Sequence, residues 1–100
     1  MRIETKCLHS GYRPENSQPL TLPVYQSTTF KYDSSETVGD LFDLKTEGHL
    51  YSRISNPTVE LVEKKIADME GGVGCVLTSS GQSALFVAFS SILKTGDHVI

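Results

Sequence analysis

The sequence predicts an α/β protein, and three observations in its second half support this class. Residues 75–77 form a compact apolar run between glycines and a Thr-Ser-Ser-Gly loop, a pattern typical of a strand buried on both faces. The loop leads into the apolar segment 84–93, which predicts a core helix beginning near Gln82. Residues 96–100 then resemble a turn and the opening of a second strand. Together these patterns predict a βαβ unit, the building block of a parallel sheet.

The first half of the chain is predicted to be an arm without a core of its own. Residues 1–50 show little hydrophobic periodicity and hold three of the four prolines. Residues 22–30 are rich in β-branched and aromatic side chains, and Pro23 makes them an edge strand or an extended arm. Ser34 is expected to open a short helix that Gly48 ends. We expect this half to pack on a neighbouring subunit or on a further part of the protein.

The best-defined element is a helix that starts at Pro57. Asn56 is a favourable N-cap, and proline at the first helical position has no N–H to leave unpaired. Glu60 and Lys64 form an i,i+4 pair in the favourable orientation, and Gly71 is suited to ending the helix. An apolar stripe at helical spacing is interpreted as core: Val59, Val62, Ile66 and Met69.

Two places are candidate anion-binding sites. The loop before the helix at Gln82 would gather unpaired backbone N–H groups at the positive end of a helix, and Gly81 lets an anion approach the backbone. A plain tight turn is the alternative there. Tyr51 and Arg53 stand two positions apart in a loop expected to be extended, so their side chains point the same way. Arginine can bind a phosphate through two parallel N–H bonds; the alternative is a solvated arginine beside a half-buried tyrosine.

Composition excludes several classes of protein. The chain has 100 residues and a net charge of −3, which allows at most one domain and argues against nucleic-acid or membrane-surface partners. Cys7 and Cys75 lack metal-ligand spacing and are expected to be reduced thiols, so no metal site is predicted. His9, His49 and His98 are scattered and are interpreted as structural or surface residues. No secretory signal or membrane span is recognisable, so a soluble cytoplasmic protein is expected.

Three motifs, in order along the chain, resemble one enzyme family. Residues 51–58, Tyr-Ser-Arg-Ile-Ser-Asn-Pro-Thr, are similar to the YxRxxNPT motif of the Cys/Met-metabolism family of pyridoxal-phosphate (PLP) enzymes. That family includes cystathionine γ-synthase, methionine γ-lyase and O-acetylhomoserine sulfhydrylase. Residues 22–30 resemble its Pro-Val-Tyr-Gln stretch, and residues 70–72 with 78–84 resemble its phosphate loop. The resemblance covers effectively the whole chain.

The resemblance implies a fold, a cofactor and site residues. The fold would be the N-terminal part of an aspartate-aminotransferase-like (fold type I) enzyme, with an arm over 1–56 that packs on a partner subunit. Residues 57–100 would begin the PLP-binding large domain and its parallel sheet. Backbone N–H groups of Gly81 and Gln82 would hold the PLP phosphate. Tyr51 and Arg53 would reach the same phosphate from the partner subunit of a dimer, within a homo-oligomer that is a dimer of active dimers.

The resemblance also limits what can be assigned. The family's Schiff-base lysine and substrate-binding residues would lie beyond residue 100, so no catalytic residue is named and the 100 residues alone should be inactive. Gln82 and the stretch 9–12 favour the sulfhydrylase branch, in which sulfide replaces the acetate of O-acetylhomoserine to give homocysteine. Methionine γ-lyase and cystathionine γ-synthase activities are the alternatives. Outside this family, a nonenzymatic phosphate-binding βα module or a docking arm for a partner would also fit the residues.

Overall fold

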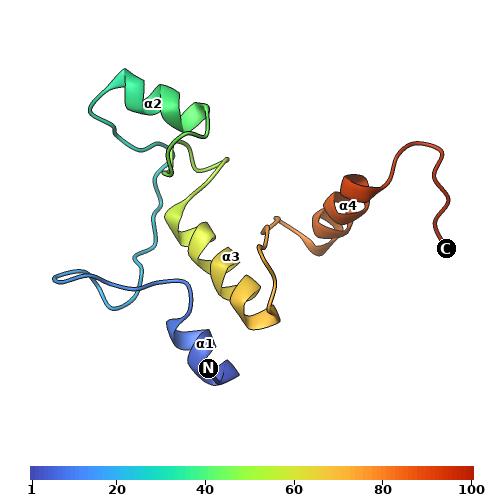
Figure 1. The fold of residues 1–100 in the computed structure, drawn as a ribbon, viewed down its shortest axis with the longest axis horizontal. Coiled ribbons are helices and arrows are strands. Elements are labelled where there is room, and N and C mark those ends of the chain that lie inside the picture. Colours follow the sequence, from blue (N-terminus) through green and yellow to red (C-terminus); the bar gives the residue numbers. More distant parts are fainter.

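The computed structural model describes residues 1–100 and contains four helices but no strand (Figure 1). In chain order these are α1 (Ile3–His9), α2 (Ser35–Phe42), α3 (Pro57–Glu70) and α4 (Gly81–Ile92). The one β interaction is an isolated antiparallel bridge between Thr29 and Tyr51. The radius of gyration is 16.9 Å, whereas a compact domain of this length measures about 13 Å. The chain is therefore an open arrangement of helices with little enclosed core.

Helix α1 was not anticipated by the sequence analysis, and its cause is partly tertiary. Glu4 in its first turn and Lys6 and His9 in its last turn complement the helix dipole. An isolated seven-residue helix is nevertheless too short to be stable in water. The additional support comes from α3, the one helix with which α1 is in extensive contact.

Polar side chains join the N-terminal segment to the C-terminal half of α3. Lys6 Nζ donates to the Asp68 carbonyl at 2.5 Å and lies 3.2 Å from its carboxylate, and the Ser10 hydroxyl also donates to that carboxylate. Gly11 has φ +85°, and a Cβ at this position would lie 3.0 Å from the Leu61 carbonyl oxygen. Only glycine permits this close approach with that backbone conformation.

Helix α2 begins as predicted but ends earlier. The Ser34 side chain caps it by accepting the N–H three residues on, but the helix ends at Phe42, with Asp43 as its C-cap, rather than at Gly48. The role of Gly48 is different: a Cβ there would lie 2.7 Å from the Tyr32 hydroxyl and 2.8 Å from the Leu41 side chain. Close packing against these two side chains therefore requires a glycine at position 48. Leu41 is the one buried hydrophobic residue of the chain.

Helix α3 confirms the predicted caps and contradicts the predicted core stripe. Asn56 caps it, Pro57 is its first residue, and Gly71 ends it with φ +69°. No residue of α3 is buried, and Val59 and Val62 are 41% and 38% exposed. The stripe has the spacing of a buried face, but these 100 residues supply too little apolar surface to cover it.

The predicted strand at 75–77 is not formed. Residues 74–78 are unpaired, and Val76 and Leu77 are 73% and 39% exposed. A strand requires the backbone of a neighbouring strand, and no backbone hydrogen bonds pair this segment with another extended segment. The second predicted strand is absent for the same reason, although the turn before it forms, with Gly96 at φ +99°.

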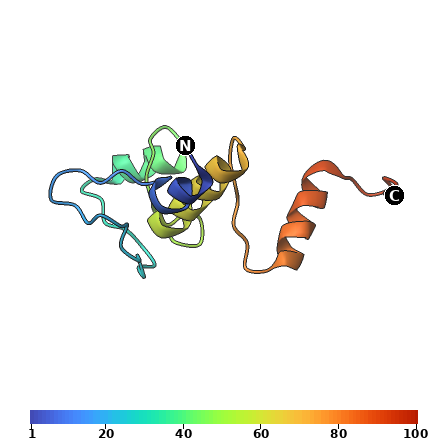
Figure 2. The same ribbon diagram turned by 90° about the horizontal axis from the view of Figure 1, so that it is seen from below.

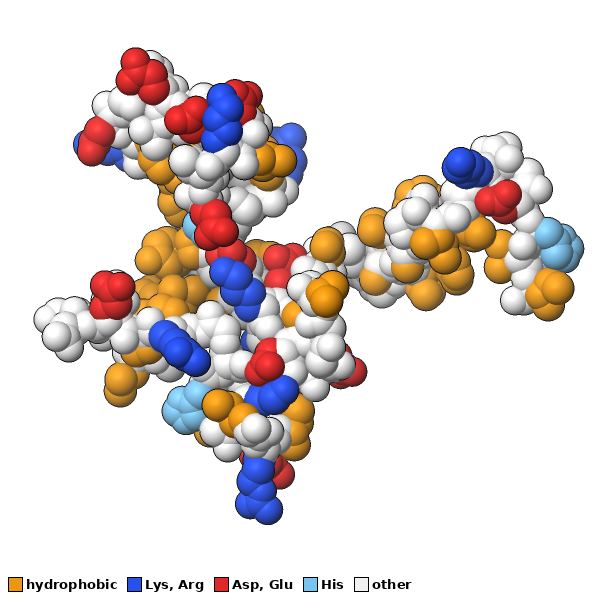
Figure 3. Space-filling view, viewed as in Figure 1, with side chains coloured by type: hydrophobic (Ala, Val, Ile, Leu, Met, Phe, Trp, Pro, Cys, Tyr) orange, Lys and Arg blue, Asp and Glu red, His pale blue; other side chains and the backbone are white.

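Helix α4 begins at Gly81, one residue before the predicted start, and none of its residues is buried. Its large apolar side chains are 48–76% exposed: Leu85, Phe86, Val87, Phe89 and Ile92. Figures 1 and 2 show α4 standing apart from the other helices, and Figure 3 shows hydrophobic side chains gathered along it. The prediction that α4 is a core helix is therefore wrong for these 100 residues.

Candidate functional site

Residues 23–30 and 50–58 form one hydrogen-bonded unit, which we call the arm seam. The Tyr25 N–H donates to Thr58 Oγ1 at 2.9 Å, and the Thr58 hydroxyl donates to the Pro23 carbonyl at 3.1 Å. Further along, the Ser52 N–H donates to the Thr28 carbonyl at 2.9 Å. The extended-arm alternative for 22–30 is thus correct, and the arm lies along the segment that precedes α3.

Asn56 is the centre of the arm seam and one of only two buried residues, at 6% exposure. Its side-chain oxygen accepts the Thr58 N–H at 2.9 Å and so caps α3. Its amide nitrogen donates to the Tyr25 carbonyl and to Ser52 Oγ, both at 3.0 Å. One side chain therefore joins the arm, the loop before α3 and the helix start, with every polar group satisfied.

Tyr51 and Arg53 lie together at the surface of the arm seam. The expected extended loop is in fact a turn, closed by the Ile54 N–H donating to the Tyr51 carbonyl at 2.8 Å. The Arg53 guanidinium lies 5.2 Å from the centre of the Tyr51 ring and donates to its hydroxyl at 3.2 Å. These are a cation–π contact and a hydrogen bond to one neighbour.

Arg53 carries a charge that no carboxylate neutralises. It is exposed, and no Asp or Glu lies within ion-pair distance of it. Because Arg53 donates to the Tyr51 oxygen, the Tyr51 O–H proton remains available to a further acceptor. The pair therefore offers an anion several donors.

The second candidate site is the N-terminus of α4. The Ser80 side chain accepts the Ser83 N–H at 3.1 Å, which satisfies one of the free groups of the first turn. The N–H groups of Gly81 and Gln82 have no hydrogen-bond partner. Nothing lies within 4 Å of a Cβ built at Gly81, so an anion can reach these donors. Ser80 was not predicted as the cap, although a serine immediately before an apolar helical segment is a recognisable N-cap signal.

The structure does not bring the two candidate sites together. No hydrogen bond or ion pair links residues 51–53 with residues 80–83. Figures 1 and 2 place α4 apart from the arm seam, beyond the far end of α3. Both sites nevertheless present donors with no acidic neighbour, which fits a phosphate group. Each could hold part of such a group.

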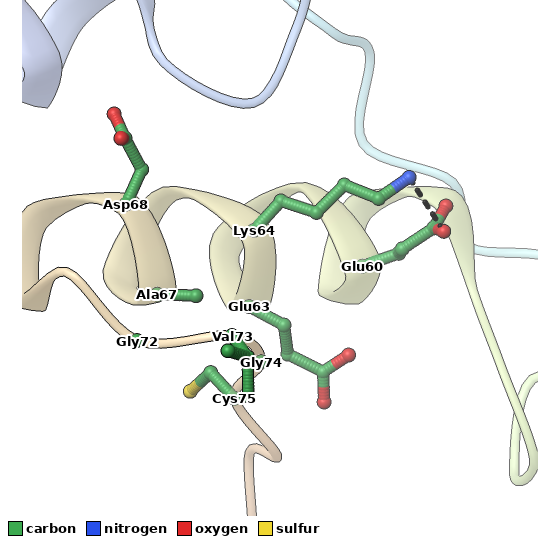
Figure 4. Close-up of a pocket in the computed structure, with 9 residues that line it drawn as sticks. All are labelled: Glu60, Glu63, Lys64, Ala67, Asp68, Gly72, Val73, Gly74 and Cys75. Carbon is green, nitrogen blue, oxygen red and sulfur yellow. Dashed lines mark ion pairs between the residues drawn. The ribbon is translucent and has the colours of Figure 1, made fainter.

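An open groove along α3 has a different character. It has a volume of about 480 Å³ between α3 and residues 72–75, and its lining includes Glu60, Glu63 and Cys75 (Figure 4). The Leu77 N–H donates to Glu63 Oε1 at 2.9 Å, which attaches the extended segment to α3. Its acidic lining disfavours an anion, so this groove is not a phosphate site.

Two carboxylates on α3 have a pKa lowered from its ordinary value. Hydrogen bonding to Lys64, 2.7 Å away, is the main cause that lowers the pKa of Glu60, and His49 adds to it. Hydrogen bonds from Ser10 and then Lys6 lower the pKa of Asp68.

Several other features bear on function. Cys7 and Cys75 are free thiols, as predicted. No group of His, Cys, Asp and Glu side chains is arranged to hold a metal ion. None of the four helices has both the length and the apolar character needed to cross a membrane.

Comparison with known proteins gives one consistent result. Residues 4–100 match the family model described as Cys/Met metabolism PLP-dependent enzyme. The chain is 43% identical over 104 residues to O-acetyl-L-homoserine sulfhydrylase 1 of Thermus thermophilus, covering all of this chain and 24% of that protein. It is 41% identical over 98 residues to L-methionine gamma-lyase of Fusobacterium nucleatum, covering 98% of this chain and 25% of that protein.

A solved structure agrees with these relatives. The putative O-acetylhomoserine (thiol)-lyase of Campylobacter jejuni, determined with N'-pyridoxyl-lysine-5'-monophosphate, matches with a TM-score of 0.88 and 31% identity. The match covers 97% of this chain and 23% of that one. The chain thus spans about a quarter of the length of the proteins that it matches.

Proposed function

Because the chain belongs to the Cys/Met metabolism family of PLP-dependent enzymes, we propose that it forms the N-terminal part of an enzyme of sulfur-amino-acid metabolism. Its fold is that of the N-terminal segment of fold type I PLP enzymes. The observation that carries the proposal is the presence of two uncompensated donor groups, Tyr51 with Arg53 and Gly81 with Gln82, within the family's motifs. Bound PLP supplies an electron sink for amino-acid chemistry.

In this proposal the chain's own residues bind and orient the cofactor phosphate. The N–H groups of Gly81 and Gln82 would hold it at the positive end of α4. Tyr51 and Arg53 would hold the same phosphate through the hydroxyl proton and the guanidinium fork. The chain contains no residue to which we assign the chemical step itself.

We further propose that the two halves of this site come from different subunits. The separation of α4 from the arm seam within one chain supports this arrangement, because neither half alone surrounds a phosphate. Residues 1–56 would form an arm that packs on a partner subunit, and residues 57–100 would begin the large domain. The assembly would be a homo-oligomer of active dimers in the cytoplasm.

The proposed reaction is γ-replacement on a small amino-acid substrate. O-acetylhomoserine would lose acetate and gain sulfide to give homocysteine and acetate. The sulfhydrylases among the relatives support this reading. L-methionine gamma-lyases at 40–41% identity support elimination from methionine as the second candidate.

The cofactor proposal is tested on the full-length protein. Purified without added PLP, it should absorb visible light, and borohydride should attach the cofactor covalently to a lysine that peptide mass spectrometry can locate. A colourless protein with no modified lysine, even after incubation with PLP, would overturn the proposal.

The reaction is tested by comparing two substrates on the same preparation. We expect homocysteine formation from O-acetylhomoserine and sulfide to be faster than α-ketobutyrate formation from methionine. The reverse order of rates would move the protein to the lyase branch while leaving its cofactor unchanged.

A further inference from the structure

His49 connects three parts of the molecule that meet at the arm seam. Its Nε2 lies 3.3 Å from the carboxylate of Glu60 in the first turn of α3, and its Nδ1 lies 3.1 Å from Ser55 Oγ. Its ring lies against Phe30 of the arm, with centres 5.9 Å apart, and its carbonyl accepts the Tyr32 hydroxyl at 2.9 Å. Both ring nitrogens and the ring face are therefore engaged.

The contact with Ser55 leads directly to the Tyr51–Arg53 turn. The Ser55 N–H donates to the Tyr51 carbonyl at 3.0 Å, next to the 2.8 Å bond from Ile54. His49 holds the side chain of the same residue whose backbone closes the turn. Arg53 has no other anchor than Tyr51, so the direction of its guanidinium depends on how firmly this turn is held.

The hydrogen-bonding roles in this chain follow from the chemistry of its groups. An ionised carboxylate only accepts hydrogen bonds, so the proton of the neutral His49 ring is placed on Nε2, which faces Glu60 at 3.3 Å. In the neutral imidazole Nδ1 is then the acceptor, and the Ser55 hydroxyl donates to it. The Lys64 ammonium, 2.7 Å away, lowers the pKa of Glu60 and so favours its ionised form. The donors and acceptors thus match without exception from α3 to the turn.

We propose that His49 is a positioning residue for phosphate binding, which fixes the Tyr51–Arg53 turn against α3 through Ser55 and Glu60. The inference rests on the proposed function of Arg53 as a phosphate ligand. It predicts that His49 contributes to the affinity for the phosphate of PLP without touching the cofactor.

The first experiment measures PLP affinity of the full-length apoenzyme by absorbance titration for wild type, His49→Asn and His49→Gln. An asparagine amide reaches about as far as Nδ1 and can bind Ser55, whereas a glutamine amide reaches about as far as Nε2 and can bind Glu60. Each variant loses one of two bonds, so we expect PLP to bind about three- to tenfold more weakly in each. His49→Ala should show a larger loss, and Lys31→Gln, which removes the exposed ion pair with Asp33, should stay within about twofold of wild type.

The second experiment separates positioning from a general structural role. Pyridoxal, which lacks the phosphate, should bind equally well to wild type and to the His49 variants. In an Arg53→Ala background, His49→Ala should cause no further loss of PLP affinity, because the group that it positions is gone. Equal weakening for pyridoxal, or full additivity with Arg53→Ala, would overturn the inference.

A last comparison keeps the inference testable if His49→Ala does not fold. Glu60→Ala removes the acceptor for Nε2 from the other side, and we expect it to weaken PLP binding but not pyridoxal binding. Unchanged PLP affinity in this variant would overturn the inference, with the proposed function intact if wild type binds PLP. A wild-type protein that binds no PLP would overturn the proposed function itself.

Discussion

The arm seam and helix α4 each carry one half of the proposed phosphate site, yet their structures have different origins. The arm seam consists of polar contacts that pair within the 100 residues, centred on the buried Asn56. Helix α4 has an apolar surface that meets nothing, with Phe86 73% exposed. The comparison teaches that polar pairing can specify a local structure that is complete, whereas an apolar helix only specifies that something must cover it.

The largest expected effect of the uncovered α4 surface is on the stability of the isolated 100-residue chain. Each large apolar side chain left in water forgoes about 1.5–3 kcal/mol of stabilisation, and α4 has five such side chains exposed. We expect the isolated chain to aggregate or to remain poorly packed, and to show no enzymatic turnover. Thermal melting with light scattering measures this. A sharp cooperative melt of a monomer would contradict the account.

In the full-length protein, α4 should behave as a core helix. Phe89 is 49% exposed here, but we expect Phe89→Ala to lower the free energy of unfolding by about 3–5 kcal/mol. Val73, in the loop after α3, is fully exposed and belongs to no apolar face, so Val73→Ala should stay within about 0.5 kcal/mol of wild type. Denaturant unfolding measures the free energy of unfolding of both variants. Equally small losses for Phe89→Ala and Val73→Ala would show that α4 is not covered in the full-length protein.

Substitutions in the arm seam should lower the free energy of unfolding by less than Phe89→Ala does, and the loss should come from polar groups. We expect Asn56→Ala to cost about 1–3 kcal/mol, because it removes a helix cap and leaves the Tyr25 carbonyl without its donor. Asn56→Ser keeps a capping oxygen and loses the amide donors, so its free energy of unfolding should be intermediate. If Asn56→Ser lowers the free energy of unfolding as much as Asn56→Ala does, the capping oxygen contributes nothing to stability.

The smallest effect is expected at the contact between α1 and α3. Ser10 and Lys6 lower the pKa of Asp68 below its ordinary value of 3.8. The resulting stabilisation is complete above pH 3.8 and is lost as the pH falls through the lower folded-state pKa. Asp68→Asn should therefore weaken hydrogen-exchange protection of the α1 amides at neutral pH while PLP affinity is unchanged. Unaltered protection of these amides would show that the contact does not hold α1.

The same contrast explains how much the sequence could predict. Asn56, Pro57 and Gly71 act through their own backbone and the next few residues, so the bounds of α3 followed from local chemistry. The strand at 75–77 depends on a neighbour that these residues do not provide, and the core assignment for α4 failed for the same reason. The helix α1 was missed because its support comes from α3, about sixty residues away.

The site shows the same division between local and distant causes. The pairing of Tyr51 with Arg53 followed from their spacing, although the loop is a turn rather than extended. The hydrogen bonds that join the arm to residues 50–58 could not be derived, because no periodicity relates two irregular segments. Gly48 was misassigned because its close neighbours, Tyr32 and Leu41, come from other segments.

The central claim is that Arg53, together with Tyr51, completes a phosphate site whose backbone donors, at Gly81 and Gln82, belong to a different subunit. Losing its charge-assisted bonds should weaken PLP retention by roughly ten- to a hundredfold. Arg53→Lys should restore only part of this affinity, because an ammonium group cannot make the two-pronged contact.

Subunit mixing tests this claim most directly. One full-length variant carries Arg53→Ala, the other lacks the lysine that binds the cofactor, and each is assayed at a PLP concentration where it is inactive alone. If Arg53 acts across the dimer, a mixed dimer contains one site with an intact lysine from the first chain and an intact Arg53 from the second. Activity should then return after subunit exchange, in about a quarter of all sites. If Arg53 serves its own chain, every site in the mixed dimer carries a defect, and the absence of recovered activity would contradict the claim.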